Sequence, residues 1–282
     1  PDVSEYLFCS IDKLLSENAI SYLKWDHNRP IFPSTGLGHA QVVALYRLLD
    51  RVQAAHPDVE IESCASGGGR VDLEILKRCA RIWASDNNDA TERLRINRSW
   101  FQFLPPEIVG NHVGPSPNPV TGRRLSIDFR AKVALFGHMG IEADPGRMTT
   151  GEREALSAHV ALYKAWRPVI HGGTLSKVSC GHDSVFGWLS LAGPRGLALV
   201  AQTAFSPVFN VPPVRFRGLC SERVYRVRLL EPWPGRGAAR LPEQERWRQG
   251  LRLSGRALAM QGLALPLALP ETAWLIGFEE EE

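Results

Sequence analysis

The stretch Tyr22-Leu23-Lys24-Trp25-Asp26-His27-Asn28-Arg29 reads as a short apolar strand that ends in a cation, an indole ring, a carboxylate and an amide. Such a cluster at a strand end is typical of a binding or catalytic site. The alternative is structural, because strand-end aspartates often cap the following helix or pair with a nearby cation, here Lys24 or Arg29. The stretch alone leaves both interpretations open. Similar clusters later in the chain favour a site.

The spacing of apolar residues predicts five consecutive strand–helix units after a first helix. Strands that alternate with helices imply a parallel sheet built from right-handed crossovers. The predicted strands are 20–25, 59–61, 81–84, 107–113 and 138–142, and the predicted helices are 2–18, 41–52, 71–79, 90–104, 127–136 and 152–166.

Polar residues gather at the C-terminal ends of all five predicted strands, which is the face where a (β/α) barrel builds its active site. The sequence therefore predicts an α/β fold with a (β/α)8 TIM barrel. A full barrel takes roughly 200 to 250 residues, so residues 1–168 are expected to hold only five of its eight units. The strand-end groups are Asp26, Glu62-Ser63-Cys64, Ser85-Asp86, Asn111-His112 and Glu142 to Asp144.

After Trp166 the helical periodicity gives way to short β-like runs separated by Gly/Pro turns such as Gly193-Pro194. This change predicts a second domain over 169–282, an antiparallel β-sandwich. The acidic run Glu279 to Glu282 is expected to be a frayed end.

The charge of +3 comes from 33 basic and 30 acidic side chains that are mostly intermixed, so no nucleic-acid partner is predicted. The richest basic region runs from Arg215 to Arg256. Its arginines alternate with apolar residues, which favours a solvated strand face over a phosphate track.

Five scattered cysteines without a CxxC pair argue against a disulfide framework or a structural zinc site and favour a reducing, cytoplasmic compartment. No apolar run is long enough to span a bilayer and no signal-peptide pattern is present, so no membrane partner is expected. The sequence begins with Pro1, so the natural start is expected to lie upstream.

Two carboxylates closely follow a tryptophan, in Trp25-Asp26 and in Trp83-Ala84-Ser85-Asp86. If their strands are near neighbours in a barrel wall, both carboxylates reach one mouth, as paired acid/base or nucleophile chemistry requires. A tryptophan beside a carboxylate suits a sugar, whose apolar face stacks on the indole, although core packing explains each tryptophan equally well.

A glycine run in Glu62 to Arg70 follows the second strand. A phosphate cradle is one interpretation, but the run lacks the GxxxxGK[ST] pattern, and close approach of a neutral ligand to the backbone is favoured. Cys64 as a nucleophile is less favoured than Cys64 as a small residue lining a site. The histidines show no metal-ligand spacing.

Three long motifs resemble, in order and spacing, the bacterial α-galactosidases of glycoside hydrolase family 36: Lys24 to Arg29, Glu62 to Arg70, and Trp83 to Leu94. The resemblance covers roughly residues 1–175, and the β region beyond fits loosely as the family's C-terminal sandwich.

The resemblance implies a retaining α-galactosidase that acts on melibiose- or raffinose-type oligosaccharides without metal or nucleotide. It implies Asp26 as the nucleophile and Asp86 as the acid/base, with Lys24 and Asn28 hydrogen-bonding galactose hydroxyls. The remaining implied substrate contacts are Trp25, Trp83, and Cys64 and Gly67 near the sugar's C6 side.

The chain also departs from the family pattern. His27 replaces a methionine, Asn88 a threonine, and Asn97-Arg98 a Gln-aromatic-Gly sequence, which bears on aglycone preference. The family's N-terminal β domain and first three barrel strands have no counterpart here, so the isolated fragment is expected to fold poorly and to be inactive. Alternatives are a relative such as an α-N-acetylgalactosaminidase, or a non-catalytic remnant. A homo-oligomer of the full-length enzyme is compatible with the sequence.

Overall fold

The computed structural model describes residues 3–28, 37–205, 211–231, 244–266 and 269–281, and it divides into two compact units, 1–86 and 87–282. Arg29, the last residue of the first motif, lies outside the described residues. Among the described residues, no helix is both long and apolar enough to cross a bilayer.

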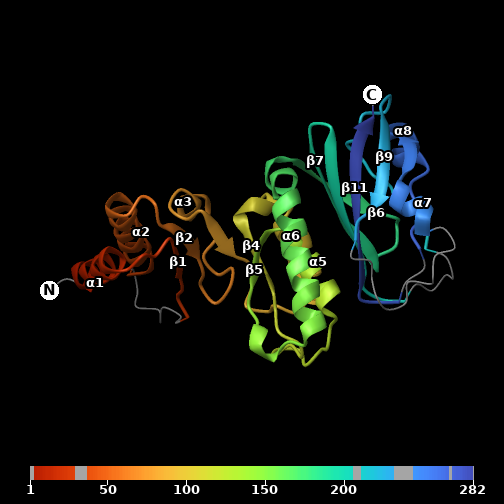
Figure 1. Cartoon of the computed structure of the whole chain (residues 1–282). Coiled ribbons are helices and arrows are strands. Elements are labelled where there is room, and N and C mark those ends of the chain that lie inside the picture. The colour runs from red at the N-terminus through yellow and green to blue at the C-terminus, as the bar shows by residue number, and fades with distance from the viewer. Residues whose placement is uncertain (1–2, 29–36, 206–210, 232–243, 267–268, 282) are drawn as a thin grey trace. The chain divides into compact units, whose positions relative to one another are not determined.

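The first unit holds three parallel strands and three helices (Figure 1). Its strands are adjacent in the order β1, β2, β3, with Lys24 opposite Glu62 and Glu62 opposite Arg81. The helices bury Leu49, Val52 and Ile75 against Ile61 of the sheet. The elements are α1 (Val3–Glu17), β1 (Tyr22–Trp25), α2 (Leu37–Ala55), β2 (Glu60–Ser63), α3 (Leu73–Leu76) and β3 (Arg81–Trp83).

The second unit begins with the next two strand–helix units, in which β4 and β5 pair in parallel and α5 packs on β4 and on α6. Helix α6 opens with a capping box in which Thr149 and Glu152 bond each other's backbone N–H groups. The elements are α4 (Ala90–Trp100), η1 (Pro106–Ile108), β4 (Val109–Val113), α5 (Ile127–Leu135), β5 (His138–Ile141), η2 (Pro145–Arg147) and α6 (Thr150–Gly172).

Helix α6 continues through Pro168 to Gly172, whereas the sequence predicted that it would end at Trp166. A proline inside a helix removes a backbone hydrogen bond. Here the last turn is kept because Val169 and Ile170 are buried in the core and the Ser190 hydroxyl donates to the Val169 carbonyl over 2.7 Å. The predicted domain boundary at 168/169 stays a prediction.

The rest of the second unit is built on an antiparallel sheet of six strands in the order β10-β9-β11-β8-β7-β6. Its strands are β6 (Thr174–Ser179), β7 (Val185–Ala192), β8 (Arg195–Gln202), β9 (Val224–Leu229), β10 (Leu251–Ser254) and β11 (Thr272–Glu281), accompanied by α7 (Gln244–Gln249) and α8 (Gly255–Met260).

Both faces of this sheet are buried, which explains the nearly continuous apolar runs in its central strands. Trp188 and Leu199 face the core that includes α5 and α6, whereas Leu189 and Val200 face a second core. Within the described residues, that second layer consists of extended segments and the helices α7 and α8, including Phe216, Trp247 and Leu258, in place of a second set of long strands.

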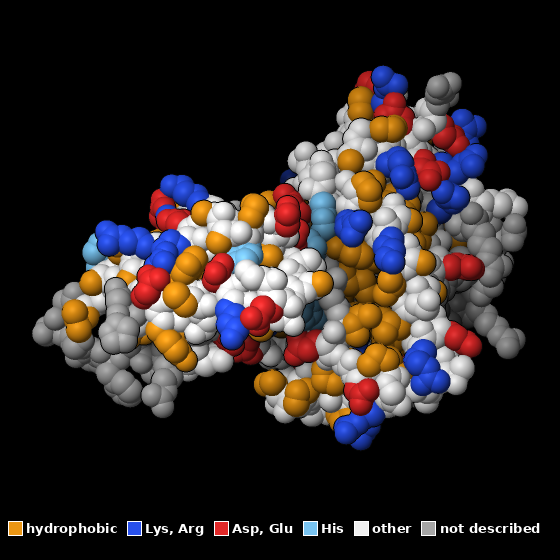
Figure 2. Space-filling model, turned by 60° about the vertical axis from the view of Figure 1, so that its left-hand side comes forward, with side chains coloured by type: hydrophobic (Ala, Val, Ile, Leu, Met, Phe, Trp, Pro, Cys, Tyr) orange, Lys and Arg blue, Asp and Glu red, His pale blue; other side chains and the backbone are white. Residues whose placement is uncertain are grey.

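The acidic residues 279–281 are not frayed as the sequence predicted, and Glu282 lies outside the described residues. Glu279, Glu280 and Glu281 belong to β11, which pairs with β9. Their carboxylates pair with arginines of the neighbouring strands, among them Arg228 over 2.8 Å and Arg226 over 2.9 Å. The alternating arginines of β9 therefore form a solvated strand face, as predicted. The face in Figure 2 likewise shows basic and acidic side chains interspersed.

Candidate active site

Asp26 directly follows β1 and is held by its own loop. The backbone N–H of His27 donates to Oδ1 over 2.7 Å, and Asn28 Nδ2 donates to Oδ2 over 2.8 Å. Burial tends to raise the pKa of this carboxyl, but hydrogen bonds from Cys64, Asn28 and backbone N–H groups outweigh it, so the pKa is lowered. Asp26 is therefore ionised at neutral pH.

Cys64, the first residue after β2, is buried, and its thiol hydrogen-bonds the Asp26 carboxylate. Burial and this bond raise the pKa of the thiol to about 11. The group therefore stays protonated at neutral pH and donates a hydrogen bond, whereas a nucleophilic cysteine needs a lowered pKa. The raised pKa argues against Cys64 as a nucleophile, and its role in lining a sugar site stays a prediction.

Lys24, Glu62 and Trp83 meet on one face of the first sheet. The Lys24 ammonium lies 4.4 Å from the centre of the Trp83 ring and 4.0 Å from Glu62 Oε1. Glu62 is only 1% exposed, so its carboxylate is shielded from water and Lys24 provides the compensating charge. The sequence named Glu62 among the strand-end groups and in a motif without a role of its own, and its position opposite Lys24 across β1 and β2 was missed.

Asp86 lies three residues beyond β3 and is exposed. The indole Nε1 of Trp83 donates to Asp86 Oδ1 over 3.1 Å. Trp83 is 2% exposed and lies in β3, so this bond joins an exposed carboxylate to a buried ring of the sheet.

Gly67 lies close both to Cys64 and to the backbone that carries Asp86. It adopts a φ of +81°, and a Cβ built on it would lie 2.7 Å from Ser85 Cα and 3.0 Å from Asp86 N. Its backbone also hydrogen-bonds Cys64. The glycine run thus permits close approach to the backbone that carries Asp86.

Arg70 was missed by the sequence interpretation, although it ends the glycine run. Its Nη2 donates to the Trp25 carbonyl over 2.9 Å and to the Cys64 carbonyl over 2.8 Å. The guanidinium thereby joins the C-terminal ends of β1 and β2. Asp26 directly follows β1, and Cys64 directly follows β2. Nearby, the Ser66 hydroxyl donates to Asn28 Oδ1 over 3.2 Å.

A cavity of about 630 Å³ opens beside Trp25 and Asp26. Side chains of α1 and α2, such as Leu7 and Leu45, form much of its wall, and neither Asp86 nor Lys24 lines it. Apolar walls cannot hydrogen-bond sugar hydroxyls, so we do not assign the sugar to this cavity. Trp25 also packs against the apolar core of the first unit, so its predicted substrate contact stays a prediction.

The strand-end groups of the second unit form a separate cluster. His112 Nδ1 lies 3.1 Å from Glu142 Oε2, and Asn88 Nδ2 donates to the same oxygen over 3.2 Å. Asn111 instead serves the fold, because its amide is buried and donates to the carbonyls of Val133 and Phe136 at the end of α5.

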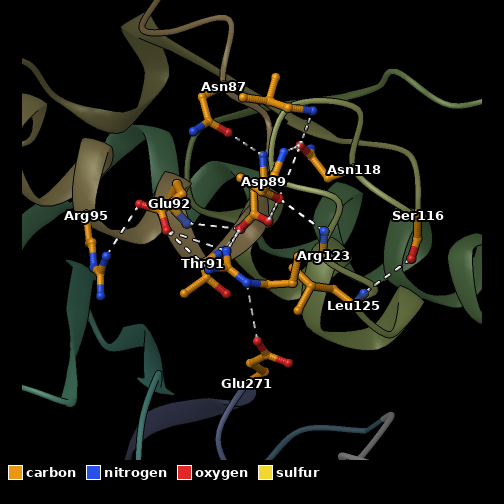
Figure 3. Close-up of polar contacts among 12 residues, drawn as sticks. Asn87, Asp89, Thr91, Glu92, Arg95, Ser116, Asn118, Arg123, Leu125 and Glu271 are labelled. Atoms are coloured by element: carbon orange, nitrogen blue, oxygen red, sulfur yellow. Dashed lines mark hydrogen bonds and ion pairs between the residues drawn. The ribbon is translucent and has the colours of Figure 1, made fainter.

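Asp89, three residues after Asp86, is the centre of a buried network (Figure 3). Its Oδ1 accepts from the backbone N–H of Thr91 at the start of α4, and Arg123 Nη1 lies 2.6 Å from the same oxygen. The Thr121 hydroxyl donates to Oδ2 over 2.6 Å. Arg123 Nε also lies 3.6 Å from Glu271, so one guanidinium joins the start of α4 to the residue before β11.

The family model described as Melibiase matches residues 1–173. The chain is 40% identical over 291 residues to an alpha-galactosidase of Escherichia coli, covering 99% of this chain and 41% of the relative. It is 36% identical over 233 residues to a probable alpha-galactosidase C of Aspergillus terreus, covering 80% of this chain and 31% of the relative. The chain thus spans well under half the length of these relatives.

Solved structures give the same result. The galactosidase domain of the alpha-galactosidase-sucrose kinase AgaSK is 30% identical with a TM-score of 0.87, covering 99% of this chain and 37% of that one. A variant of the GH36 alpha-galactosidase AgaA of Geobacillus stearothermophilus, in complex with raffinose, is 26% identical with a TM-score of 0.86, covering 99% and 38%.

These likenesses confirm the predicted fold class, α/β with a partial (β/α)8 barrel followed by an antiparallel sheet domain. Together with the match over residues 1–173, they show that the chain belongs to the Melibiase family, the GH36 alpha-galactosidases that its motifs predicted.

Proposed function

We propose that the full-length protein containing this chain is a retaining α-galactosidase that releases terminal α-galactosyl groups through a covalent glycosyl-enzyme. The observation that carries the proposal is the pair of strand-end carboxylates in one unit. Asp26 is kept ionised by Cys64 and Asn28, and Asp86 is anchored to Trp83.

In the first step, an Asp26 oxygen attacks the anomeric carbon while the glycosidic C–O bond breaks. Asp86 delivers its proton to the departing oxygen. In the second step, Asp86 takes a proton from a water molecule, the water oxygen attacks the same carbon, and the Asp26 carboxylate leaves. This double displacement requires the two carboxyl groups to stand about 5 to 5.5 Å apart.

The other predicted residues have roles in holding the sugar. Lys24 and Asn28 bind galactose hydroxyls, Cys64 and Gly67 line the pocket near C6, and Trp83 and Trp25 contact the ring. Support comes from the contacts that Lys24 makes with Trp83 and that Asn28 and Cys64 make with Asp26. These contacts involve four of the six proposed residues, and they support the proposed assignment.

The proposed substrates are melibiose- and raffinose-type α-galactosides. Relatives of the chain have been solved in complex with raffinose and with stachyose, which supports this class over an α-N-acetylgalactosaminide. A substrate panel on the full-length enzyme separates the two. We also propose a cytoplasmic location, which the five free cysteines support.

Azide rescue tests the two catalytic roles by stereochemistry. In the full-length enzyme, Asp26→Ala removes the nucleophile, so azide attacks the activated galactoside directly and yields the β-galactosyl azide. Asp86→Ala leaves the covalent intermediate intact, so azide displaces Asp26 and yields the α-galactosyl azide. Asp58→Ala, at an exposed turn, is the control and retains activity. Any other assignment of products to variants contradicts the proposal.

A further inference from the structure

A groove of about 390 Å³ lies along β6, the outermost strand of the six-stranded sheet. Three cations line it, namely Lys177, Arg215 and Arg217. It lies in the β region of the second unit and contains none of the residues proposed for galactoside cleavage.

Strand alternation brings these cations to one face. Val178 is fully buried, so its neighbours Lys177 and Ser179 point away from the core. Val214 and Phe216 are buried in the same way, which turns Arg215 and Arg217 outward.

Backbone hydrogen bonds hold residues 177–179 of β6 beside residues 214–217. Ser179 and Arg215 form an antiparallel bridge in which the Arg215 N–H donates to the Ser179 carbonyl over 3.3 Å. Val214 and Leu263 exchange two backbone hydrogen bonds of 2.9 and 2.8 Å. Isolated backbone bridges therefore fix the walls of the groove beside the edge strand β6, and Pro212-Pro213 adds a stiff wall.

The side chains that line the groove give it a positive charge. None of the residues that line it is acidic, and within the part of the chain that the structure describes no carboxylate lies within 4.0 Å of the three cations. The arginines at the other edge of the sheet differ, since Arg223 pairs with Glu280 over 2.7 Å and Arg252 with Glu281 over 2.6 Å. Gathering like charges in one groove raises the local potential, and a bound anion lowers it.

The groove lacks the features of a neutral sugar site. None of its lining residues is aromatic, so no ring is available to stack on a sugar face. The side chains of Ser179 and Gln261 add hydrogen-bond donors beside the cations. Its volume lies within the range of small-molecule sites, roughly 300 to 1,000 Å³.

We propose that this groove binds a small phosphate-bearing ligand, with Arg215 and Arg217 engaging the phosphate oxygens and Lys177 supplying a third positive charge. One guanidinium group can donate two parallel hydrogen bonds to two oxygens of the same phosphate. The shared chemistry is the phosphate group, which can come from free phosphate or from a sugar phosphate.

Calorimetric titration of the full-length protein with inorganic phosphate, glucose 6-phosphate and glucose tests the site. We expect both phosphates to bind and glucose to give no heat at the same concentration. If glucose 6-phosphate binds more tightly than inorganic phosphate, the ligand of the groove is a sugar phosphate. If the two affinities are equal, the ligand is free phosphate. Absence of binding of either phosphate at roughly 10 mM overturns the proposal, since a weaker site has no role at ordinary metabolite levels.

Matched double variants locate the binding. Arg215→Gln with Arg217→Gln is expected to weaken phosphate binding by about tenfold or more, whereas Arg223→Gln with Arg252→Gln removes the same charge from the same domain and leaves the affinity unchanged. Lys177→Gln changes a single exposed residue and is expected to give a smaller loss of phosphate affinity. It replaces the first double variant as the test if that variant does not fold. Equal losses in both double variants mean non-specific attraction and contradict the site.

Discussion

The indole Nε1 of Trp83 donates a hydrogen bond to Asp86 Oδ1 over 3.1 Å, while the face of the same ring lies 4.4 Å from the Lys24 ammonium. One buried side chain therefore orients both a carboxylate from the loop after β3 and a cation from β1. A sheet residue of this kind holds two groups of a candidate site in fixed register.

Trp83→Phe keeps an aromatic ring for Lys24 and removes the donor to Asp86. A hydrogen bond to a charged group contributes roughly 1.5 to 3 kcal/mol, so we expect kcat/KM to fall by about tenfold or more. If Asp86 is the proton donor, the loss is larger for raffinose than for an aryl galactoside whose leaving group needs little protonation. Steady-state kinetics of the full-length enzyme measure this, with Trp100→Phe in α4 as the control. Equal losses for both substrates contradict a role through Asp86.

Cys64→Ala removes a donor to the ionised form of Asp26. The pKa of Asp26 is lowered by its hydrogen bonds, Cys64 among them, so loss of one raises it. Because the nucleophile must be ionised, the acidic limb of the kcat/KM profile is expected to move to higher pH. Cys79→Ala removes a buried thiol in the core of the first unit and leaves that limb in place. An unchanged profile for Cys64→Ala shows that the bond does not tune Asp26.

Asp89→Asn keeps the cap of α4 and removes the charge that pairs with Arg123. Asp89 is fully buried, and loss of a hydrogen-bonded charge at such a site costs about 1 to 3 kcal/mol of unfolding free energy. Denaturant unfolding of the full-length protein at pH 7 measures the cost. Asp144→Asn, at an exposed cap of η2, is the control and changes stability by less than about 0.5 kcal/mol.

The comparison of the wild type with Asp89→Asn also predicts how the free energy of unfolding depends on pH. Burial raises the pKa of Asp89, but bonds from Thr121, the Glu92 N–H and Arg123 lower it below its ordinary value. A lowered folded-state pKa stabilises the protein above the unfolded pKa, roughly 3.9, and this stability is lost as the pH falls through the folded value. The gap between wild type and Asp89→Asn is therefore full at pH 5 to 7 and narrows in acid. A gap that stays constant down to acid unfolding excludes this charge as its cause.

Gly67→Ala separates backbone strain from a steric clash. The new Cβ would meet Ser85 and Asp86 at a positive φ, so we expect a loss of about 2 to 4 kcal/mol in stability together with reduced activity. Gly122→Ala has a similar φ of +70° with open space around it and costs only about 1 kcal/mol. Thermal unfolding of both variants gives the comparison. Equal losses of stability in the two variants would mean that the close contact of residue 67 with the backbone of Ser85 and Asp86 adds nothing to the cost.

Some elements were missed because their cause lies far away in the chain. Helix α3 is an exception, because its start has a local cause, the Asp72 side chain that accepts from the Ile75 N–H; it spans only Leu73–Leu76, less than predicted. The extension of α6 past Pro168 depends on burial against β7. Order in Glu279 to Glu281 depends on arginines some fifty residues earlier in the sequence. No local pattern carries such information.

The sequence by itself determined the alternation of strands and helices, the polar groups at strand ends, and the three motifs of the family, because period and residue type follow from local geometry. Only the tertiary structure decided that Cys64 donates to Asp26, that Glu62 lies beside Lys24, and that Arg70 ties β1 to β2. Each of these contacts joins residues that lie on, or in the loops after, different strands, and strand pairing and side-chain packing set those distances.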